Sequence, residues 1–298
     1  MIETAEPFRR GALIYNPRAG RGHHDDPSLR RVRSLLHQRG ITLEIHATVQ
    51  PGDATRLAEE IRHQGSDFVI VKGGDGTLNE VLQGIMGSSL ALAVWPAGTA
   101  NILARLLRIP RDPEALVRMI VAGRVRRISV GRAGSRYFFL MAGIGLDASI
   151  VQQVNPALKR YGGILAFWIA GMKHLLTWRA PVFTVELDDD VISATFAAVA
   201  LSPSYGGGLL IAPDARLDDE WFRVCCVTTR SKWRYLTYLP LAFWGRHVTC
   251  RGVVYRKSRR VRAVASSPIA VQVDGELAGC LPMSFELIPS AVRVVVPE

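Results

Sequence analysis

A glycine-rich turn that carries one carboxylate is the first segment whose residues could do chemistry. The apolar run Phe68–Val71 leads into Gly73-Gly74-Asp75-Gly76-Thr77, and a helical pattern follows at once. Glycines permit a tight reversal and leave no Cβ between the backbone and a ligand. A helix that starts there offers unpaired N–H groups to a phosphate, and Asp75 could accompany a phosphate-bound metal. A plain connecting turn, with Asp75 or Thr77 as a helix cap, explains the same residues equally well.

Two more polar turns that contain glycine follow apolar runs. Asn16-Pro17-Arg18-Ala19-Gly20 follows Ala12–Tyr15, and Pro96-Ala97-Gly98-Thr99-Ala100-Asn101 follows Ala91–Trp95. Ligands of parallel α/β sheets bind at the carboxyl ends of the strands, so three such turns predict one nucleotide crevice. The sequence contains neither a P-loop nor a Rossmann G-x-G-x-x-G after the first strand.

The elements that must position these turns alternate between strand and helix. Apolar residues recur at helical spacing after Pro27, after Ala54 and after Leu78, and short apolar runs separate these stretches. This alternation predicts a parallel sheet with helices on both faces. We therefore expect an α/β nucleotide-binding domain over residues 1–130.

The pattern changes near residue 130. Short strands joined by turns follow, and the stretch Pro181–Ser202 is interpreted as two of them. Helices are expected at Tyr161–Trp178 and Ser231–Trp244. We expect a β-rich antiparallel sandwich or barrel over residues 131–298, and the return of its final strand to the first domain stays open.

Composition narrows the class of partner. The chain has 298 residues, is 48% hydrophobic and carries a formal net charge of +11, which is typical of folded domains with an anionic partner or a solvated Arg-rich surface. No nucleic-acid module is recognisable, so nucleic acid is not expected.

The four cysteines lack metal-ligand spacing, which fits a reducing cytoplasm. The longest apolar stretch, Gly163–Met172, is too short to span a bilayer, so a soluble or peripheral protein is expected.

Several motifs together resemble one known family. The nucleotide-site motifs of the diacylglycerol kinase catalytic domain, whose superfamily includes sphingosine, ceramide and bacterial lipid kinases, are similar to NPRAG at Asn16–Gly20, GGDGTLNEV at Gly73–Val81 and PAGTANILAR at Pro96–Arg105. The resemblance continues in the family's order through AGIGLDA at Ala142–Ala148, APDARLDD at Ala212–Asp219 and VDGE at Val273–Glu276.

The resemblance implies ATP and Mg²⁺, and an active site in a cleft between the two domains. Matching the motifs residue by residue implies a set of ATP contacts. They are Asn16, Pro17, Gly20, Thr48, Gly73, Gly74, Asp75, Gly76, Thr77, Asn79, Glu80, Gly98, Thr99 and Asn101.

The resemblance also implies three catalytic carboxylates, on Glu276, Asp274 and Asp75. Glu276 is expected to accept the proton of the lipid hydroxyl, with Asp274 in support. Asp75 is expected to position Mg²⁺, although some branches of the superfamily use this position as the base. From the residues alone, Asp274-Gly275 between alternating apolar residues is a strong signal for a plain hairpin turn.

Two further metal positions follow from the resemblance. Asp147 is expected to reach the metal through water, and a helix N-cap is its alternative. A second, structural Mg²⁺ is expected on Asp219 with the main-chain carbonyls of Arg216 and Trp221. Glu220 stands where the family has glycine, so an ordinary acidic turn is an equal alternative.

Basic and aromatic residues flank the two expected helices of the second domain. Such residues suit the headgroup level of an anionic bilayer, and two core helices with snorkelling ends are the alternative. The residues expected at the membrane are Lys159, Arg160, Trp168, Lys173, Trp178 and Trp233.

The sequence thus favours an ATP-dependent lipid kinase that transfers the γ-phosphate to a hydroxyl of diacylglycerol, ceramide, a sphingoid base or a related lipid. We expect it in the cytoplasm, peripheral at the inner membrane face. An NAD kinase-like small-molecule kinase, which shares GGDG, and a non-catalytic lipid- or nucleotide-binding protein on the same fold are the alternatives. The acceptor lipid and the oligomeric state, a homodimer included, stay open.

Overall fold

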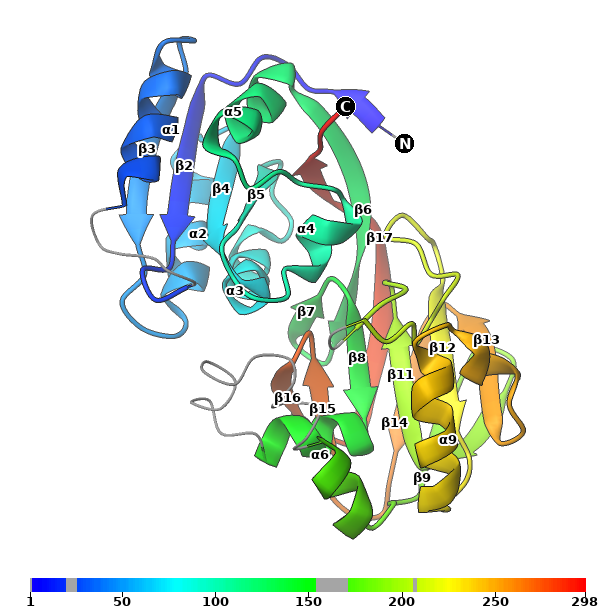
Figure 1. Cartoon of the computed structure of the whole chain (residues 1–298). Coiled ribbons are helices and arrows are strands. Elements are labelled where there is room, and N and C mark those ends of the chain that lie inside the picture. The colour runs from blue at the N-terminus through cyan, green and yellow to red at the C-terminus, as the bar shows by residue number, and fades with distance from the viewer. Residues whose placement is uncertain (1, 20–25, 154–170, 206–207) are drawn as a thin grey trace. The chain divides into compact units, whose positions relative to one another are not determined.

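The computed structural model describes residues 2–19, 26–153, 171–205 and 208–298, and these residues form two compact units (Figure 1). The first unit comprises Met1–Ile128 and Ser290–Glu298, and the second comprises Ser129–Pro289. The chain therefore leaves the first unit within β6 (Arg124–Ala133) and returns to it within β17 (Met283–Val295).

The first unit is built on parallel strands in the order β5-β4-β2-β3, and the last residues of β17 extend this sheet in parallel beside β5. These strands are β2 (Arg10–Tyr15), β3 (Thr42–Ala47), β4 (Phe68–Gly73) and β5 (Ala91–Pro96). The helices are α1 (Pro27–His37), α2 (Asp53–His63), α3 (Asp75–Ile85), α4 (Ile102–Leu106) and α5 (Pro113–Ala122). The short strand β1 (Ile2–Thr4) pairs with the start of β6.

The order of the strands fixes which face each helix covers. The chain moves from β2 outward to β3, then back across β2 to β4 and on to β5. Because such crossovers are right-handed, α1 covers one face, and α2 and α3 cover the other. In agreement, α2 packs against α3, and α1 packs against α5. The apolar runs of β4 and β5 are buried between these layers, as expected for parallel strands.

The second unit contains a six-stranded antiparallel sheet in the order β13-β12-β11-β8-β15-β16. Its strands are β8 (Met141–Ile144), β11 (Phe196–Ala200), β12 (Phe222–Val227), β13 (Val253–Ser258), β15 (Ala270–Val273) and β16 (Glu276–Cys280). Further antiparallel strands pair in the order β10-β9-β14-β17, and β7 pairs with β6. They are β7 (Arg136–Phe138), β9 (Phe183–Glu186), β10 (Val191–Ala194) and β14 (Arg260–Val264).

Alternating side chains of the six-stranded sheet face two different cores. Val199 and Val224 join the main apolar cluster with Phe183 and Phe285 of the other strands, which makes a sandwich. Their neighbours along the strands, such as Ala198 and Cys225, point to the opposite face. That outer face is covered by α6 (Leu146–Gln153), α9 (Lys232–Ala242) and a helical segment over residues 171–177.

One sequence expectation for this unit is wrong. The stretch Pro181–Ser202 forms three strands, because the chain passes at Thr195 from β10 in one sheet to β11 in the other. The buried Thr195 hydroxyl binds the carbonyls of Val227 and Thr229 at this crossing point. A short 3₁₀ helix, η1 (Arg246–Thr249), precedes β13.

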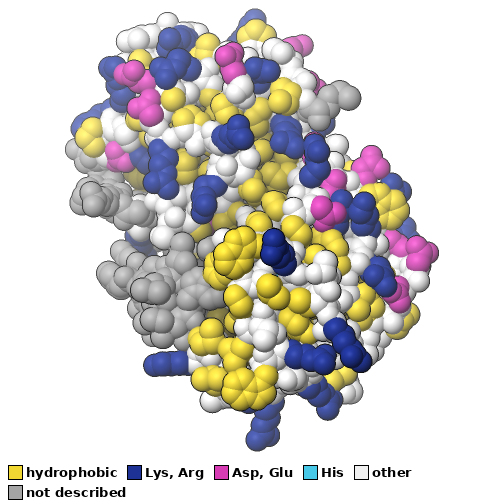
Figure 2. Space-filling view, turned by 45° about the vertical axis from the view of Figure 1, so that its right-hand side comes forward, with side chains coloured by type: hydrophobic (Ala, Val, Ile, Leu, Met, Phe, Trp, Pro, Cys, Tyr) yellow, Lys and Arg dark blue, Asp and Glu magenta, His cyan; other side chains and the backbone are white. Residues whose placement is uncertain are grey.

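Figure 2 shows Lys and Arg side chains spread over the visible surface, in keeping with the net charge of +11. Among the residues that the structure describes, no helix combines the length and the apolar character needed to cross a membrane.

Candidate functional site

The four parallel strands of the first unit end at the same edge of the sheet. Asn16, Thr48, Gly74 and Ala97 are the residues that directly follow β2, β3, β4 and β5. The connections after β2 and β4 leave toward opposite sides, so the edge between these strands is the topological switch point of the sheet. Asn16 spans it, because its amide nitrogen donates to the Thr77 hydroxyl at 3.4 Å.

The glycine-rich turn after β4 touches the turn after β5. A Cβ added to Gly98 would lie 2.6 Å from the Cα of Gly74, and one added to Gly73 would lie 2.6 Å from the Cβ of Thr77. The N–H groups of Ala97 and Gly98 both donate to the Gly73 carbonyl. This close approach of two backbones explains why the two turns need glycine.

Asp75 is the first residue of α3, and its carboxylate spans the two turns. Its Oδ1 accepts a hydrogen bond from the N–H of Ile102 at 2.8 Å, at the start of α4. The preceding residue, Asn101, is buried in a left-handed conformation and exchanges hydrogen bonds with the backbone of Gly98. Asp75, Gly98 and Asn101 are therefore held as one connected group.

Other expected nucleotide contacts have structural partners away from this group. Oε2 of Glu80 accepts hydrogen bonds from the N–H groups of Gly52 and Ala54, at 3.0 and 3.2 Å, at the start of α2. The Asn79 side chain is buried and bonded to Gln83. Pro17 lies in the turn after β2, and Gly76 is the second residue of α3. Thr48 is half-buried and Thr99 is exposed, whereas Gly20 lies outside the described residues.

Lys72 is a neighbouring group that sequence reasoning did not single out. It is the residue before the glycine-rich turn, and its ammonium group pairs with Asp26 and lies 4.0 Å from the centre of the Trp95 ring. Asp26 caps α1, so this ion pair joins the end of β4 to the start of α1. A lysine before GGDG was visible in the sequence, but its partner lies far away along the chain.

The second unit presents a tight hairpin between β15 and β16. Asp274 and Gly275 have φ values of 49° and 89°, and Val273 pairs with Glu276, as in a two-residue type I′ turn. The Asp274 carboxylate accepts hydrogen bonds from three consecutive backbone N–H groups, at 2.8 to 3.1 Å. These donors are Phe139, Leu140 and Met141. Asp274 therefore anchors the hairpin to the chain between β7 and β8.

Glu276 is the first residue of β16 and is paired with an arginine. Its Oε2 accepts a hydrogen bond from Nη2 of Arg136 at 2.9 Å, and both side chains are about one third exposed. Arg136 belongs to β7. The ion pair therefore restrains a carboxylate that remains accessible to a reactant.

Asp147 lies at the start of α6 and joins the same hairpin through one glutamine. Its Oδ2 accepts a hydrogen bond from Nε2 of the buried Gln272 at 2.5 Å. Oε1 of Gln272 accepts from the N–H of Gly275 at 2.7 Å and from the hydroxyl of Tyr205 at 3.1 Å. Burial raises the pKa of Asp147 to about 7, and the hydrogen bond from Gln272 opposes this rise.

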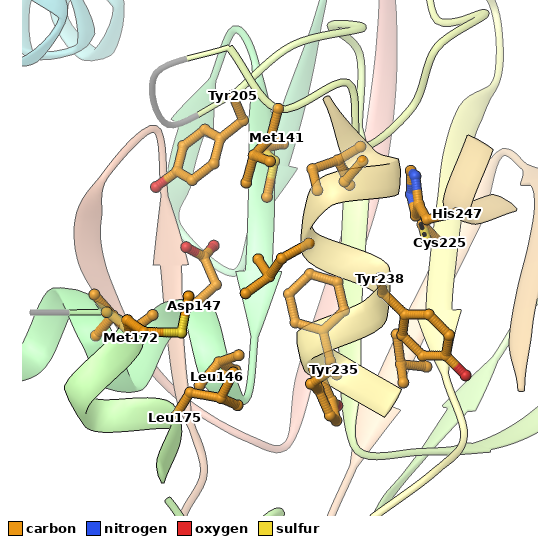
Figure 3. A pocket seen from close by; sticks show the side chains of 18 residues that line it. Met141, Leu146, Asp147, Met172, Leu175, Tyr205, Cys225, Tyr235, Tyr238 and His247 are labelled. Atoms are coloured by element: carbon orange, nitrogen blue, oxygen red, sulfur yellow. Dashed lines mark hydrogen bonds between the residues drawn. The ribbon is translucent and has the colours of Figure 1, made fainter. Parts of the chain in front are cut away.

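An apolar pocket of about 130 Å³ opens beside Asp147. Figure 3 shows Asp147 and Tyr205 on one side of the pocket, with Tyr235 and Tyr238 of α9 on the other. The remaining lining is almost wholly apolar and comes from β8, β11, β12, α6, α9, η1, the segment 171–177 and the chain between β11 and β12. Asp147 is the one carboxylate among the described residues of the lining, so its partly exposed surface can face a ligand there.

The acidic turn expected to hold a second metal contacts a buried arginine. Oδ2 of Asp219 accepts from the N–H of Arg216 at 3.1 Å and lies 3.3 Å from Nη2 of Arg223, whose side chain is buried. Arg223 also pairs with Asp214 at 2.9 Å. The single guanidinium group offsets only one of these two negative charges, so the metal site expected on Asp219 with the carbonyls of Arg216 and Trp221 stays a prediction.

In the part of the chain that the structure describes, no three His, Cys, Asp or Glu side chains gather as metal ligands. A metal that arrives with a nucleotide needs only one or two carboxylates, because phosphate oxygens and water complete its coordination. Asp75 at the switch point has the chemistry for that role, whereas Asp147 belongs to the second unit and accepts a hydrogen bond from Gln272.

The residues expected at a membrane do not share one environment. Trp178 is only 7% exposed and packs edge-on against Tyr235, with ring centres 5.4 Å apart, so the expectation that it lies at a membrane surface is wrong. Trp233 is 77% exposed, and Lys173 is also exposed. Lys159, Arg160 and Trp168 lie outside the described residues.

Comparison with known families matches both units. Residues 10–133 match the model of the diacylglycerol kinase catalytic domain, and residues 141–296 match that of the YegS C-terminal NAD kinase beta sandwich-like domain. The expected combination of an α/β domain with a β-sandwich is thereby confirmed.

Full-length relatives agree with this match. The chain is 32% identical over 296 residues to a diacylglycerol kinase of Bacillus subtilis, covering 98% of this chain and 97% of the relative. It is 31% identical to a diacylglycerol kinase of Staphylococcus saprophyticus, covering 97% and 96%. The crystal structure of a putative diacylglycerol kinase from Bacillus anthracis has the same fold, with a TM-score of 0.82 at 23% identity over 98% of this chain and 97% of that one.

Proposed function

Because the chain belongs to the diacylglycerol kinase family, we propose that it transfers the γ-phosphate of ATP to the hydroxyl group of a lipid. Diacylglycerol is the first acceptor to consider, since the relatives are named for it. The observation that carries the lipid assignment is the apolar pocket with a single carboxylate, linked by Gln272 to the hairpin of Glu276. An apolar slot suits an alkyl chain, whereas a dinucleotide would need more polar partners.

ATP would bind at the switch point of the first unit. Backbone N–H groups at the start of α3 suit its phosphates, and the contact of Gly74 with Gly98 keeps side chains out of their way. Asn16 and Thr77 supply polar groups beside that turn. Glu80 would act indirectly, by holding α2 against α3.

The Asp75 carboxylate fits a divalent cation that enters with the nucleotide. We propose that this cation is Mg²⁺. Such an ion would offset the charge that develops on the transferred phosphoryl group. Asp75 would hold it in place, because its carboxylate is fixed by the N–H of Ile102.

Glu276 would take the proton of the acceptor. The hydroxyl oxygen bonds to the γ-phosphorus while the bond between that phosphorus and the bridging oxygen of ADP breaks, and the hydroxyl proton moves to the Glu276 carboxylate. The ion pair with Arg136 would hold the Glu276 carboxylate in one orientation. Asp274 would be a positioning residue, since three backbone N–H groups already occupy its carboxylate.

Asp147 would bind the polar end of the acceptor. It stands on the wall of the pocket, and its hydrogen bond to Gln272 ties the position of that end to the hairpin. We place the reaction at an anionic membrane surface on the cytoplasmic side, because the acceptor resides in a bilayer and the chain is strongly basic.

The test is an acceptor panel with γ-labelled ATP and Mg²⁺. The panel contains short-chain diacylglycerol, ceramide, sphingosine, phosphatidylglycerol, undecaprenol and NAD. We expect label in a lipid phosphate with the wild type and none with Asp75→Asn. Label in NADP, or in no acceptor although the protein is folded and binds ATP, would refute the proposal.

A further inference from the structure

Helix α9 carries apolar side chains on two opposite sides. Tyr235, Tyr238, Leu239 and Ala242 face inward and line the pocket. The side that faces away begins with Trp233, which is 77% exposed, and ends beyond the helix with Trp244, which is 70% exposed. A helix of a soluble protein normally places polar residues on such an outer side.

The outer residues of α9 recur at helical spacing. Trp233, Thr237 and Pro240 are all exposed, and their intervals of four and three residues place them along one stripe of the helix. Trp244, which is also exposed, follows two residues after the last residue of α9. Phe243, beside Trp244, is also exposed, and their ring centres lie 6.4 Å apart.

The segment 171–177 extends this apolar surface. The Lys232 ammonium group donates to the carbonyl of Leu176 at 2.7 Å, which fixes the end of this segment beside the start of α9. Met172 and Leu176 are exposed. Met172 also lines the pocket, so the pocket opens at the margin of the exposed surface.

The charged residues of the segments that form this surface are basic. The sequence contains no Asp or Glu between Glu220 and Asp274, and none between Asp147 and Glu186. Lys173, Arg234 and Arg246 are exposed there. Figure 2 shows hydrophobic side chains on the visible face of the second unit with Lys and Arg among them, while acidic side chains lie toward its right-hand side.

We propose that this surface docks on an anionic lipid bilayer. The α9 surface consists of Met172, Leu176, Trp233, Phe243 and Trp244, with Lys173, Arg234 and Arg246 beside them. Tryptophan rings favour the headgroup level of a bilayer, and the basic side chains pair with anionic headgroups. The pocket margin at Met172 would then face the acyl chains, so a lipid could enter without crossing water.

This role of the surface in delivering an acceptor rests on the proposed function, whereas docking itself needs no catalysis. The full chain is mixed, without ATP, with vesicles of phosphatidylcholine alone or with one third phosphatidylglycerol, and bound protein is measured by sedimentation. The wild type should prefer the anionic vesicles, and added salt should weaken that preference.

Two double variants separate the apolar contribution to vesicle binding from the electrostatic contribution. Trp233→Ser with Trp244→Ser should lower binding to anionic vesicles at least tenfold. Arg234→Gln with Arg246→Gln should lower it roughly 25-fold, since each basic residue near an anionic surface contributes about fivefold. Brominated phospholipid should quench the fluorescence of the wild type and quench that of the tryptophan variant much less.

Matched controls come from exposed residues elsewhere. Val191 on β10 is 68% exposed, so Val191→Ser tests the loss of an exposed apolar residue. Arg33→Gln with Arg39→Gln removes the same charge from exposed positions in and beyond α1. Both controls should bind vesicles within about twofold of the wild type, by the argument that surface potential acts locally.

Wild-type binding by a folded tryptophan variant would overturn the proposal, as would equal binding to neutral and anionic vesicles. Dimerisation through this surface, without vesicle binding, would assign it to a second copy instead. Failure of the proposed function has a different signature, because docking would persist without phosphorylation. If docking fails but the function holds, the tryptophan variant phosphorylates vesicle lipid at the wild-type rate.

Discussion

Gln272 donates a hydrogen bond from Nε2 to Oδ2 of Asp147 at 2.5 Å, and its Oε1 accepts from the N–H of Gly275 at 2.7 Å. One buried amide therefore holds the carboxylate of the pocket and the backbone of the hairpin in a fixed relation. In the proposed reaction, Asp147 binds the acceptor, and the proton of the acceptor hydroxyl moves to Glu276. The relation between these groups then depends on Gln272.

Replacing Gln272 by leucine should uncouple the pocket from the hairpin. The hydrogen bonds of the Gln272 side chain to Asp147 and Gly275 are lost, so we expect kcat to fall at least tenfold while the KM for ATP changes little. Tyr205→Phe removes only the hydroxyl group that donates to the same amide, and it should cost less than threefold. Steady-state kinetics that rank the two variants in the opposite order would contradict this role.

The chain at Gly143 should tolerate no larger residue. A Cβ there would lie 1.9 Å from Oδ2 of Asp147 and 2.7 Å from Nε2 of Gln272. Gly143→Ala should therefore displace Asp147 and lower kcat/KM for the acceptor at least tenfold, as measured with a short-chain lipid. Gly134→Ala is a control on a turn with open space around it, although its φ of 57° adds some strain. Unchanged acceptor kinetics in Gly143→Ala would argue against a role for Asp147.

Arg136 should matter to turnover rather than to ATP binding. Arg136→Met removes the ion pair to Glu276, so kcat should fall about tenfold or more, and Arg136→Lys should restore part of it. Arg132→Met provides the control, because Arg132 pairs with the exposed Glu286 instead. Equal kinetics for the Arg136 and Arg132 methionine variants would show that Glu276 needs no such partner.

Residues that line the pocket should govern acceptor affinity. Leu239 and Leu236 are neighbours on α9, but only Leu239 belongs to the described lining of the pocket. Leu239→Trp should fill the pocket and raise the KM for a long-chain acceptor at least tenfold, while Leu236→Trp should leave it within about threefold. A similar rise in both variants would point to a general disturbance of α9.

Asp147 should make folding stability depend on pH. Its pKa is raised from the ordinary 3.8 to about 7 by burial, so between these values the folded state retains a proton that the unfolded state loses. This contribution to stability is complete below about pH 4 and is lost as the pH rises to about 7, by at most about 4 kcal/mol. Asp147→Asn lacks this contribution. Its free energy of unfolding, measured with a chemical denaturant, should therefore rise relative to that of the wild type between pH 5 and pH 8. A constant difference across that range would refute the raised pKa.

The sequence predicted the α/β fold of the first unit because its signals are local. Apolar runs such as Phe68–Val71 are buried in full, and the turns around Gly74 and Gly98 follow from strand ends that any parallel sheet brings together. The hairpin at Asp274-Gly275 was likewise predicted from two residues and their alternating neighbours.

The roles of individual side chains could not be predicted, because their partners lie far away in the chain. Glu80 and Asp274 are both acidic residues of a motif, yet their carboxylates bind backbone N–H groups of other elements. Trp178 ends one helical pattern of the sequence, and Trp233 lies near the start of a similar one. Only Trp178 is buried, because it packs against Tyr235. The described lining of the pocket comes from eight separate segments, and the periodicity of a sequence does not reveal such a space.

The central claim is that Glu276 accepts the proton of an acceptor whose phosphorylation uses ATP. A single-turnover measurement tests it most directly, with enzyme in excess over γ-labelled ATP and with saturating short-chain diacylglycerol. We predict that Glu276→Gln binds ATP with wild-type affinity but forms labelled phosphatidic acid at least a hundredfold more slowly, in line with the usual contribution of a general base. Transfer by the variant at the wild-type rate would contradict the account.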